Sequence, residues 1–220
     1  MISVAIDGPS GAGKSTLAKR LAKELGYLYV DTGAMYRSIG LFALRKGVDP
    51  KDEAAVTALL PQIQIELRYV DGAQRVLLCG EDVSEAIRAE EVGMATSAVS
   101  AHPPGRAFLL ELQRGMARTH DILMDGRDIG TVILPNASVK IFLTASAEAR
   151  ATRRFRELQE KGVDTDFETV LEDIRRRDYQ DSHRATAPLR QAEDAVLVDT
   201  SEMDLEESFQ ALKSLILSRI

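Results

Sequence analysis

One stretch near the start of the sequence restricts the fold more than any other feature. Residues 8–15 read Gly-Pro-Ser-Gly-Ala-Gly-Lys-Ser and match the phosphate-loop pattern G-x-x-x-x-G-K-[ST]. The run from Ile2 to Ile6 before it is apolar and too short for a helix, which indicates a buried parallel strand. After it, an apolar stripe at every fourth position predicts a helix over about 14–25. This order of strand, loop and helix predicts an α/β fold that binds a nucleoside triphosphate.

The chemistry of phosphate binding explains why these residue types occur at this spacing. Glycines let the backbone curl so that successive N–H groups point at phosphate oxygens, and the start of the following helix offers its positive dipole end. We expect Lys14 to reach the β- and γ-phosphates and the hydroxyl of Ser15 to bind Mg²⁺. The residues predicted to bind ATP are Gly8, Pro9, Ser10, Gly11, Ala12, Gly13, Lys14, Ser15 and Thr16.

Further strands and helices alternate along the rest of the chain. Four more short strands are predicted, at 27–31, 122–124, 139–143 and 195–198. Helices are predicted at 33–46, 147–160 and 166–180, and a closing amphipathic helix carries Leu205, Phe209, Leu212 and Ile216. Five strands that alternate with helices predict one parallel sheet covered by helices on both faces.

The middle of the chain departs from this alternation. Polar and apolar residues alternate over 63–69, and Asp71-Gly72 is typical of a hairpin turn into a return strand at 75–79. Two helices are predicted to follow, at about 89–101 and 104–119. We interpret this segment as an insertion that carries a small antiparallel sheet.

Composition sets outer limits on the class of protein. A chain of 220 residues suits one domain with modest insertions, and 28 basic against 34 acidic residues argue against broad nucleic-acid binding. The single cysteine, Cys79, excludes an internal disulfide, fits a reducing cytoplasm and is expected to be buried as a small apolar residue. No apolar run approaches the ~18 residues that span a membrane, and the start of the chain does not resemble a signal peptide. We expect a cytoplasmic protein and, by default, a monomer.

Arginines near strand ends indicate an acceptor that carries a phosphate of its own. Arg37 follows the second predicted strand and Arg127 follows the third, at the edge where open α/β sheets bind ligands. A guanidinium group binds phosphate through two hydrogen bonds and keeps its charge. Asp125, at the end of the third strand, suits either a second carboxylate near Mg²⁺ or a cap of the strand end. The pattern favours a kinase of a small phosphorylated acceptor.

A first arginine cluster lies on the predicted helix at 147–160. Arg150, Arg153 and Arg154 fit a mobile lid that closes over the triphosphate, excludes water and stabilises the charge that develops during transfer. Together with Lys14 and Arg127 they are the predicted catalytic residues. Acidic neighbours of the cluster leave a plain charged helix face as the alternative.

A second cluster follows on the next predicted helix. Arg177, Asp181 and Arg184 share one helix face, because they are spaced four and three residues apart. Asp181 either bridges the two arginines as an ion pair, or accepts a hydrogen bond from a ribose hydroxyl while they hold a phosphate.

The sequence gives less support to other classes of protein that contain a phosphate loop. A GTP-binding switch is expected to carry Asn-Lys-x-Asp, but the one asparagine, Asn136, is followed by Ala137. The Leu-Ser-Gly-Gly signature of transporter ATPases is absent. His102, His120 and His183 are scattered and fit no metal-ligand or nucleophile pattern. The alternatives that stay open are a kinase of UMP, AMP or shikimate, and a nucleotide sensor without an acceptor.

Six segments together resemble the bacterial cytidylate kinases over nearly the whole chain. They are residues 6–15, 31–37, 80–84, 125–132, 140–143 and 184–189. The phosphate loop is generic, whereas Asp-Gly-Arg-Asp-Ile-Gly-Thr-Val and the Arg-x-x-x-Pro-Leu ending are far more specific. The resemblance implies Mg²⁺-dependent transfer of the ATP γ-phosphate to CMP or dCMP, a step of pyrimidine nucleotide metabolism.

The resemblance also implies roles for residues at positions that match the family's motifs. The residues that would bind the acceptor phosphate are Arg37, Arg127, Arg177 and Arg184. The sugar would be bound by Thr32 and Asp181. The cytosine ring would be recognised by Ser97, Arg106 and Asp128. A carboxylate accepts a hydrogen bond from the amino group of cytosine. Uracil has a carbonyl oxygen at that position, so its binding would leave the carboxylate without a donor and is disfavoured. Many relatives have Ser in place of Thr32, and Pro103-Pro104 interrupt the helix between Ser97 and Arg106.

The same resemblance implies a division of the chain, 1–220, into three parts of one P-loop kinase domain. The core would cover about 1–34, 120–148 and 183–220. The region that binds the nucleoside monophosphate would cover about 35–119, and the lid about 149–165.

Overall fold

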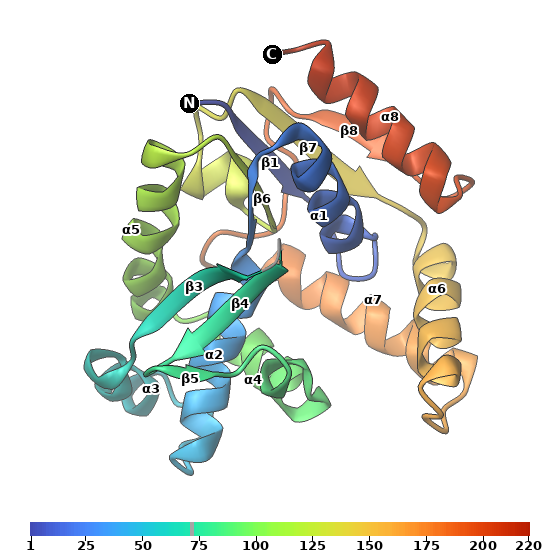
Figure 1. The fold of residues 1–220 in the computed structure, drawn as a ribbon. Helices are drawn as coiled ribbons and strands as arrows, with labels where there is room; N and C mark the ends of the chain where they lie inside the picture. The colour runs from blue at the N-terminus through green and yellow to red at the C-terminus, as the bar shows by residue number, and fades with distance from the viewer. Residues whose placement is uncertain (71–72) are drawn as a thin grey trace. The chain divides into compact units, whose positions relative to one another are not determined.

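The computed structural model describes residues 1–70 and 73–220, whose elements are labelled in Figure 1. The chain divides into two units. The first comprises Met1–Leu28 and His120–Ile220, and the second comprises Tyr29–Thr119. No helix among the described residues is both long enough and apolar enough to cross a membrane.

A five-stranded parallel sheet confirms the predicted fold class, with the strand order β2-β6-β1-β7-β8. Its strands are β1 (Ser3–Asp7), β2 (Leu28–Asp31), β6 (Ile122–Gly126), β7 (Val139–Thr144) and β8 (Val196–Asp199). The central strands β1 and β6 are buried almost throughout, as parallel strands between helices should be. In this order the connection from β1 runs toward the edge strand β2, whereas the connection from β6 runs in the opposite direction, to β7. Ligands of open α/β folds bind where the direction of the connections reverses in this way.

The register of these strands brings two loops to one level. Ile6 of β1 pairs with Asp125 of β6, and Asp7 pairs with Gly126. On its other side Asp7 pairs with Phe142 of β7. Because all three strands run in parallel, the phosphate loop and the segment after Gly126 leave the sheet at the same edge.

The helices of the first unit are α1 (Lys14–Leu25), α6 (Ala147–Glu160), α7 (Phe167–His183) and α8 (Leu205–Leu217). Helix α1 packs against β1, β6 and α8. It ends at Gly26, whose left-handed φ of +72° allows a tight C-cap. Helix α8 begins with a capping box between Asp204 and Glu207, in which each side chain accepts a hydrogen bond from the backbone N–H of the other residue.

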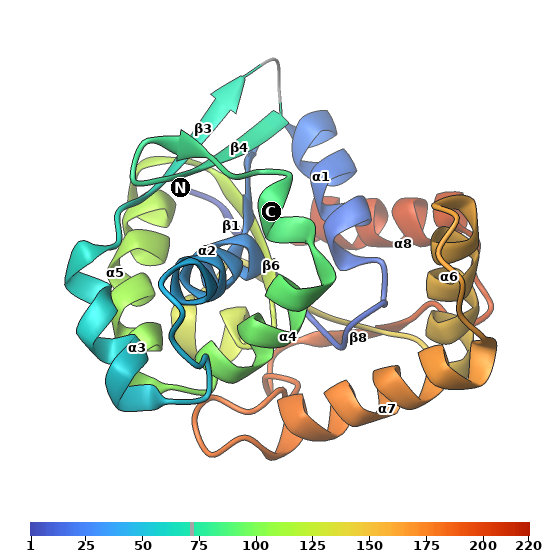
Figure 2. The same ribbon diagram turned by 90° about the horizontal axis from the view of Figure 1, so that it is seen from below.

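Helices α6 and α7 form a hairpin with a small apolar core of its own (Figures 1 and 2). Ala151 of α6 packs there against Val170 and Ile174 of α7. The rings of Phe155 and Phe167 meet edge to face, with centroids 6.2 Å apart. This core holds the two helices together independently of the sheet.

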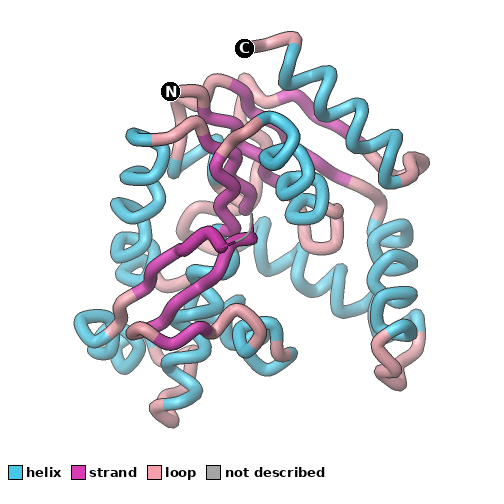
Figure 3. Tube along the Cα trace, viewed as in Figure 1, coloured by secondary structure: helices cyan, strands magenta, loops and turns pink. Residues whose placement is uncertain are grey.

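The second unit is mostly helical. Its helices are α2 (Thr32–Arg45), α3 (Glu53–Leu59), α4 (Glu90–Val99) and α5 (Pro103–Thr119), with single 3₁₀ turns at Leu60–Gln62 and Ala86–Arg88. An antiparallel sheet of β3 (Ile65–Val70), β4 (Ala73–Leu78) and β5 (Glu81–Asp82) accompanies them, drawn in magenta in Figure 3. This sheet confirms the predicted antiparallel insertion, while the predicted turn Asp71-Gly72 lies outside the described residues.

Five short elements of the described residues were not predicted: α3, β5, the 3₁₀ turns at Leu60–Gln62 and Ala86–Arg88, and a single π-helical turn at Ile129–Ile133. All are too short to show a hydrophobic period. The prediction that Cys79 is buried is wrong, because Cys79 is exposed in the turn from β4 to β5. Cys79 and Gly80 both adopt a left-handed conformation there, with φ of 51° and 87°. Such a tight turn projects from the sheet and cannot contribute to the core.

Candidate active site

The phosphate loop is pressed closely against β7. A Cβ atom at Gly8 would lie 1.9 Å from the carbonyl oxygen of Leu143, so glycine is required at the start of the loop. Gly13 ends the loop in the left-handed region, with φ of 82°, and α1 begins at the next residue. The ammonium group of Lys14 turns back along the loop and donates a hydrogen bond to the carbonyl oxygen of Pro9 at 2.7 Å.

Lys14 lies in an unusual electrostatic environment. The pKa of Lys14 is lowered to about 7, mainly by burial and also by the positive charge of Arg127. The carboxylates of Asp125, Asp181 and Asp7 act in the opposite direction. An anion bound to the loop would act in the same direction as these carboxylates, so it would raise the pKa of Lys14 and favour its charged form.

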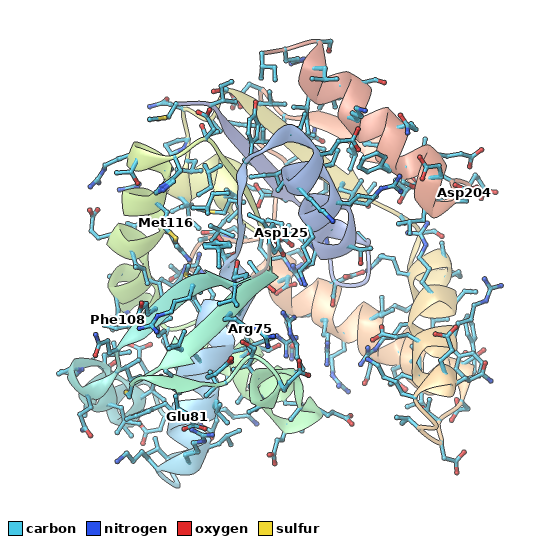
Figure 4. All side chains as sticks on the ribbon, in the orientation of Figure 1. Arg75, Glu81, Phe108, Met116, Asp125 and Asp204 are labelled. Carbon is cyan, nitrogen blue, oxygen red and sulfur yellow. The ribbon has the colours of Figure 1, made fainter. Side chains whose placement is uncertain are left out.

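Ser15 and Asp125 meet beside the start of α1, where Figure 4 labels Asp125. The Ser15 hydroxyl donates a hydrogen bond of 2.8 Å to Oδ2 of Asp125, which is 4% exposed. Over residues 1–70 and 73–220, no group of three His, Cys, Asp or Glu side chains could hold a metal ion by itself. Hard oxygen donors of this kind suit Mg²⁺, which prefers a few protein ligands plus substrate phosphates. The pair therefore fits a cation that arrives with a nucleotide.

Arg127 follows β6 and faces a carboxylate from α7. Its Nε donates to Oδ2 of Asp181 at 2.7 Å. Burial disfavours the charge of Arg127, but Asp181, Asp125 and Asp7 outweigh it and raise the pKa of the guanidinium group. Asp181 thus forms an ion pair with Arg127, which neither of the two alternatives considered for Asp181 included.

Asp128, the next residue, lies beside Arg184 at the end of α7. The guanidinium NH2 of Arg184 is 3.6 Å from Oδ1 of Asp128, and both side chains are buried. Nε of Arg184 donates to the carbonyl oxygen of Ala187 at 2.7 Å, so a local turn holds the arginine in place. Arg177, one helical turn before Asp181, is half-buried. The first unit therefore gathers five of the predicted acceptor residues around α7 and the end of β6.

The three predicted lid arginines have different surroundings. Arg150 is 4% exposed, and its two terminal nitrogens bind the carboxylate of Asp178 at 2.9 and 2.6 Å. Its NH1 also reaches the carbonyl oxygen of Ser10 in the phosphate loop at 3.0 Å. Arg153 binds the backbone of Thr200 instead. Arg154 is about half exposed and pairs with Glu157 on its own helix at 2.8 Å, as the alternative of a charged helix face predicts.

Arg150 is expected to be important for stability, because its removal leaves the buried carbonyl oxygen of Ala145 and the part-buried acceptors of Ser10 and Asp178 without this donor. Replacing Arg150 with methionine should lower the free energy of unfolding by about 3–5 kcal/mol. Replacing the exposed Arg154 with alanine should change it by no more than about 0.5 kcal/mol. Unfolding in urea, followed by circular dichroism, measures both values. Equal effects of the two variants would contradict the structural role of Arg150.

Two of the predicted acceptor residues of the second unit are on α2. Thr32 is buried at the first position of the helix. Arg37 lies further along the helix and donates through NH1 to the carbonyl oxygen of Ile87 at 3.2 Å.

The two others are on α4 and α5. Ser97 is exposed on α4, whereas Arg106 on α5 is 9% exposed. NH1 of Arg106 donates to the carbonyl oxygen of Ser100 at 3.0 Å, and the guanidinium group lies 5.4 Å from the centre of the Tyr36 ring. Helix α4 ends at Val99 and α5 begins at Pro103, so the predicted break between the two helices is confirmed.

Two buried contacts of the site were missed by the sequence analysis. Asp178 received no role, although it holds Arg150, and nothing in its spacing distinguishes it from its acidic neighbours. Asp7 also received no role, although both of its oxygens accept backbone hydrogen bonds from the segment after Asp128. A signal for Asp7 was present, because a charged residue closed a buried apolar strand directly before the loop.

Comparison with known proteins identifies the family. The family model for cytidylate kinase matches residues 4–217. The chain belongs to the cytidylate kinase family. A cytidylate kinase of Caldicellulosiruptor bescii is 49% identical over 214 residues, which cover 97% of this chain and 95% of that protein. One of Geobacillus kaustophilus is 50% identical over 219 residues, which cover 100% of this chain and 98% of that protein.

Members of the cytidylate kinase family are nucleoside monophosphate kinases, with ATP as phosphate donor and nucleotides as substrates. The predicted family and enzyme class are therefore confirmed. The fold agrees with a solved gluconokinase of Sinorhizobium meliloti, with a TM-score of 0.50 and 14% identity over 99% of this chain and 93% of that one. At this identity the likeness concerns the fold alone.

Proposed function

We propose that this protein transfers the γ-phosphate of ATP to CMP or dCMP, with Mg²⁺, and releases ADP and the cytidine diphosphate. The observation that carries the proposal is about 50% identity to cytidylate kinases over nearly the full length of both chains. The geometry of the first unit supports it, because the phosphate loop and Arg127 leave the sheet at the same edge. Transfer needs no covalent intermediate with the protein, since alignment and charge neutralisation suffice.

The donor half of the reaction uses the phosphate loop. In the proposed roles, residues 8–16 cradle the phosphates of ATP, and Lys14 neutralises the β- and γ-phosphates. Ser15 and Asp125 provide oxygen ligands for Mg²⁺, and Mg²⁺ would stabilise the negative charge shared between donor and leaving group. Arg150, held against Ser10, keeps the loop in its binding conformation rather than contacting the nucleotide.

The acceptor half is proposed to use the cations that the family resemblance implies. Arg37, Arg127 and Arg184 are proposed to hold the phosphate of CMP, with Arg177 adding positive charge. Thr32 and Asp181 are proposed to face the sugar. We assign recognition of the cytosine ring to Ser97, Arg106 and Asp128. The carboxylate of Asp128 would accept the amino hydrogens of cytosine, so a base without that amino group leaves it unpaired.

We also propose that the chain works in three parts, as the family resemblance implies. Residues 35–119 would bind the monophosphate and 149–165 would act as the lid. Residues 1–34, 120–148 and 183–220 would form the core. Of Arg150, Arg153 and Arg154, Arg154 is the most available to ATP, because it is exposed and pairs with Glu157 on the surface of its own helix. A monomeric state and a cytoplasmic location stay predictions.

The test is ADP production from Mg-ATP with one acceptor at a time: CMP, dCMP, UMP, AMP, shikimate or none. We expect strong turnover with CMP and dCMP alone. Turnover with another acceptor would retain the phosphate loop and arginines but refute the roles of Ser97, Arg106 and Asp128. Turnover independent of any acceptor would refute the kinase function. Addition of EDTA should abolish ADP production, and excess Mg²⁺ should restore it.

Binding of ATP is expected to take up a proton above neutral pH. The pKa of Lys14 is about 7 without a ligand, so at pH 8 this side chain is mostly neutral. A bound triphosphate favours the ammonium form, hence about one proton enters with each ATP and the affinity falls as the pH rises from 7 to 9. Calorimetry in buffers of different ionisation enthalpy measures the uptake. Lys14→Arg, which stays charged, should abolish it; equal uptake in this variant would exclude Lys14 as the source.

A further inference from the structure

A single buried carboxylate connects the phosphate loop to the segment that follows β6. Asp7 is the last residue of β1, directly before the first glycine of the loop, and it is 4% exposed. Its Oδ1 accepts a hydrogen bond from the N–H of Ile129 at 2.7 Å, and its Oδ2 accepts one from the N–H of Gly130 at 2.7 Å. One side chain thus joins two loops that are 122 residues apart in sequence.

This arrangement replaces the ordinary way of capping a helical turn. The first N–H groups of a helical turn have no partner within it, and an Asp directly before the turn usually accepts from them. Asp128 has that position before the turn at Ile129–Ile133, yet its side chain makes no cap hydrogen bond. Asp7 caps the turn from another strand, and the Asp128 carboxylate lies beside Arg184 instead.

The contact is close and electrostatically costly. A Cβ atom on Gly130 would be 3.1 Å from Cδ of Lys140 and 3.4 Å from Oδ2 of Asp7, so it would be crowded by Lys140 and would be in ordinary van der Waals contact with the carboxylate. The pKa of Asp7 is raised to about 6, mainly by burial and also by Asp128, while the two N–H groups and Lys14 act in the opposite direction. The protein therefore holds an ionised carboxylate at neutral pH at the expense of stability, as functional sites often do.

We propose that Asp7 is a positioning residue that sets the separation between the donor phosphates on the loop and the acceptor groups Arg127 and Asp128. This inference rests on the proposed function. Direct phosphoryl transfer needs the reacting atoms about 3–3.5 Å apart and in line, and a displacement of about 1 Å can reduce the rate about 10²-fold. Asp7 touches neither nucleotide in this role; it fixes the backbone of the two segments that do.

The test compares Asp7→Asn with Asp121→Asn. An asparagine at position 7 can accept one of the two N–H groups but points its own NH₂ at the other. Asp121 offers a matched contact at the opposite end of β1, where its Oδ1 accepts from the N–H of Ile2 at 2.6 Å. We expect Asp7→Asn to lower kcat with CMP about 30- to 100-fold and to leave KM for ATP within about threefold. Asp121→Asn should leave kcat unchanged at a similar unfolding temperature.

Three outcomes would refute the positioning role of Asp7, and one of them would also refute the proposed function. A wild-type kcat in Asp7→Asn, or an equal loss in Asp121→Asn, overturns the positioning role while the kinase function stands. Absence of CMP-dependent turnover in the wild-type protein refutes the proposed function and this inference with it. If Asp7→Asn does not fold, Asp7→Ser, which offers one smaller acceptor, is judged by the same kcat criterion.

Discussion

Replacing Arg127 with alanine is expected to lower kcat about 10³-fold or more and to leave the Kd for ATP within about threefold. The guanidinium group follows β6 at the level of the phosphate loop, and Nε is 2.7 Å from Asp181. We assign it to the acceptor phosphate, where its charge offsets the charge that moves between the two nucleotides. Affinity for ATP should be retained, because the variant also removes a positive charge that lowers the pKa of Lys14.

Steady-state kinetics with CMP, together with calorimetric titration of ATP, separate the two effects of Arg127→Ala. Arg176→Ala is the matched control, since Arg176 is exposed on α7 and pairs with Asp173 at 2.7 Å. Its kcat should equal that of the wild-type protein. Unchanged turnover in Arg127→Ala would contradict the assignment. Asp181→Asn should have a smaller effect, because it retains the arginine and removes the carboxylate that orients it.

Gly8→Ala is the second change with a large expected effect, on both stability and nucleotide binding. The new Cβ atom would lie 1.9 Å from the carbonyl oxygen of Leu143, which is backbone of β7 and cannot move aside. The loop must therefore shift away from the sheet. We expect a loss of about 3 kcal/mol or more in the free energy of unfolding, a fall of at least about 6 °C in Tm, and no measurable ATP binding.

Gly26→Ala is the control for the substitution itself. Gly26 also has a positive φ, of 72°, but an added Cβ atom there meets no heavy atom within 4 Å. This variant should lose about 1–2 kcal/mol from backbone strain alone and bind ATP normally. Thermal unfolding and ATP titration of both variants provide the comparison. A Gly8→Ala protein that binds ATP as the control does would show that the loop tolerates displacement.

The elements of the first unit were predictable because their signals are local. Helix α1 covers 14–25 and α6 covers 147–160, with the bounds that the sequence predicts. A four-residue apolar period and a terminating glycine depend on only a few neighbours along the chain. The parallel sheet followed from the alternation of short apolar runs with such helices. By contrast, α3 and the π-helical turn at 129–133 were missed, because one or two turns leave no period to detect.

Side-chain identity was also enough to predict the phosphate loop and the enzyme family. The loop depends on backbone conformations that glycine alone adopts easily, so the spacing of its glycines can be recognised in the sequence without the structure. The arginines after the strands could be chosen as site candidates for the same reason, since strand ends are visible in the sequence. Their individual partners could not be chosen. Asp181 pairs with Arg127, 54 residues away, rather than with a neighbour on its own helix.

Only the tertiary structure decided which charged groups are buried together. Arg150 and Arg154 are equally basic on one helix, yet the first is enclosed by Asp178 and the phosphate loop while the second faces solvent. In the sequence Asp7 is recognisable only as the last residue of a strand. The tertiary structure places the turn after Asp128 next to it, where the N–H of Ile129 donates to Oδ1 of Asp7. The α/β fold, the phosphate loop and the family could be inferred from the amino-acid sequence alone. Packing determined the ion pairs and the Asp7 contact, because the energy of a buried charge depends on partners that are distant along the chain.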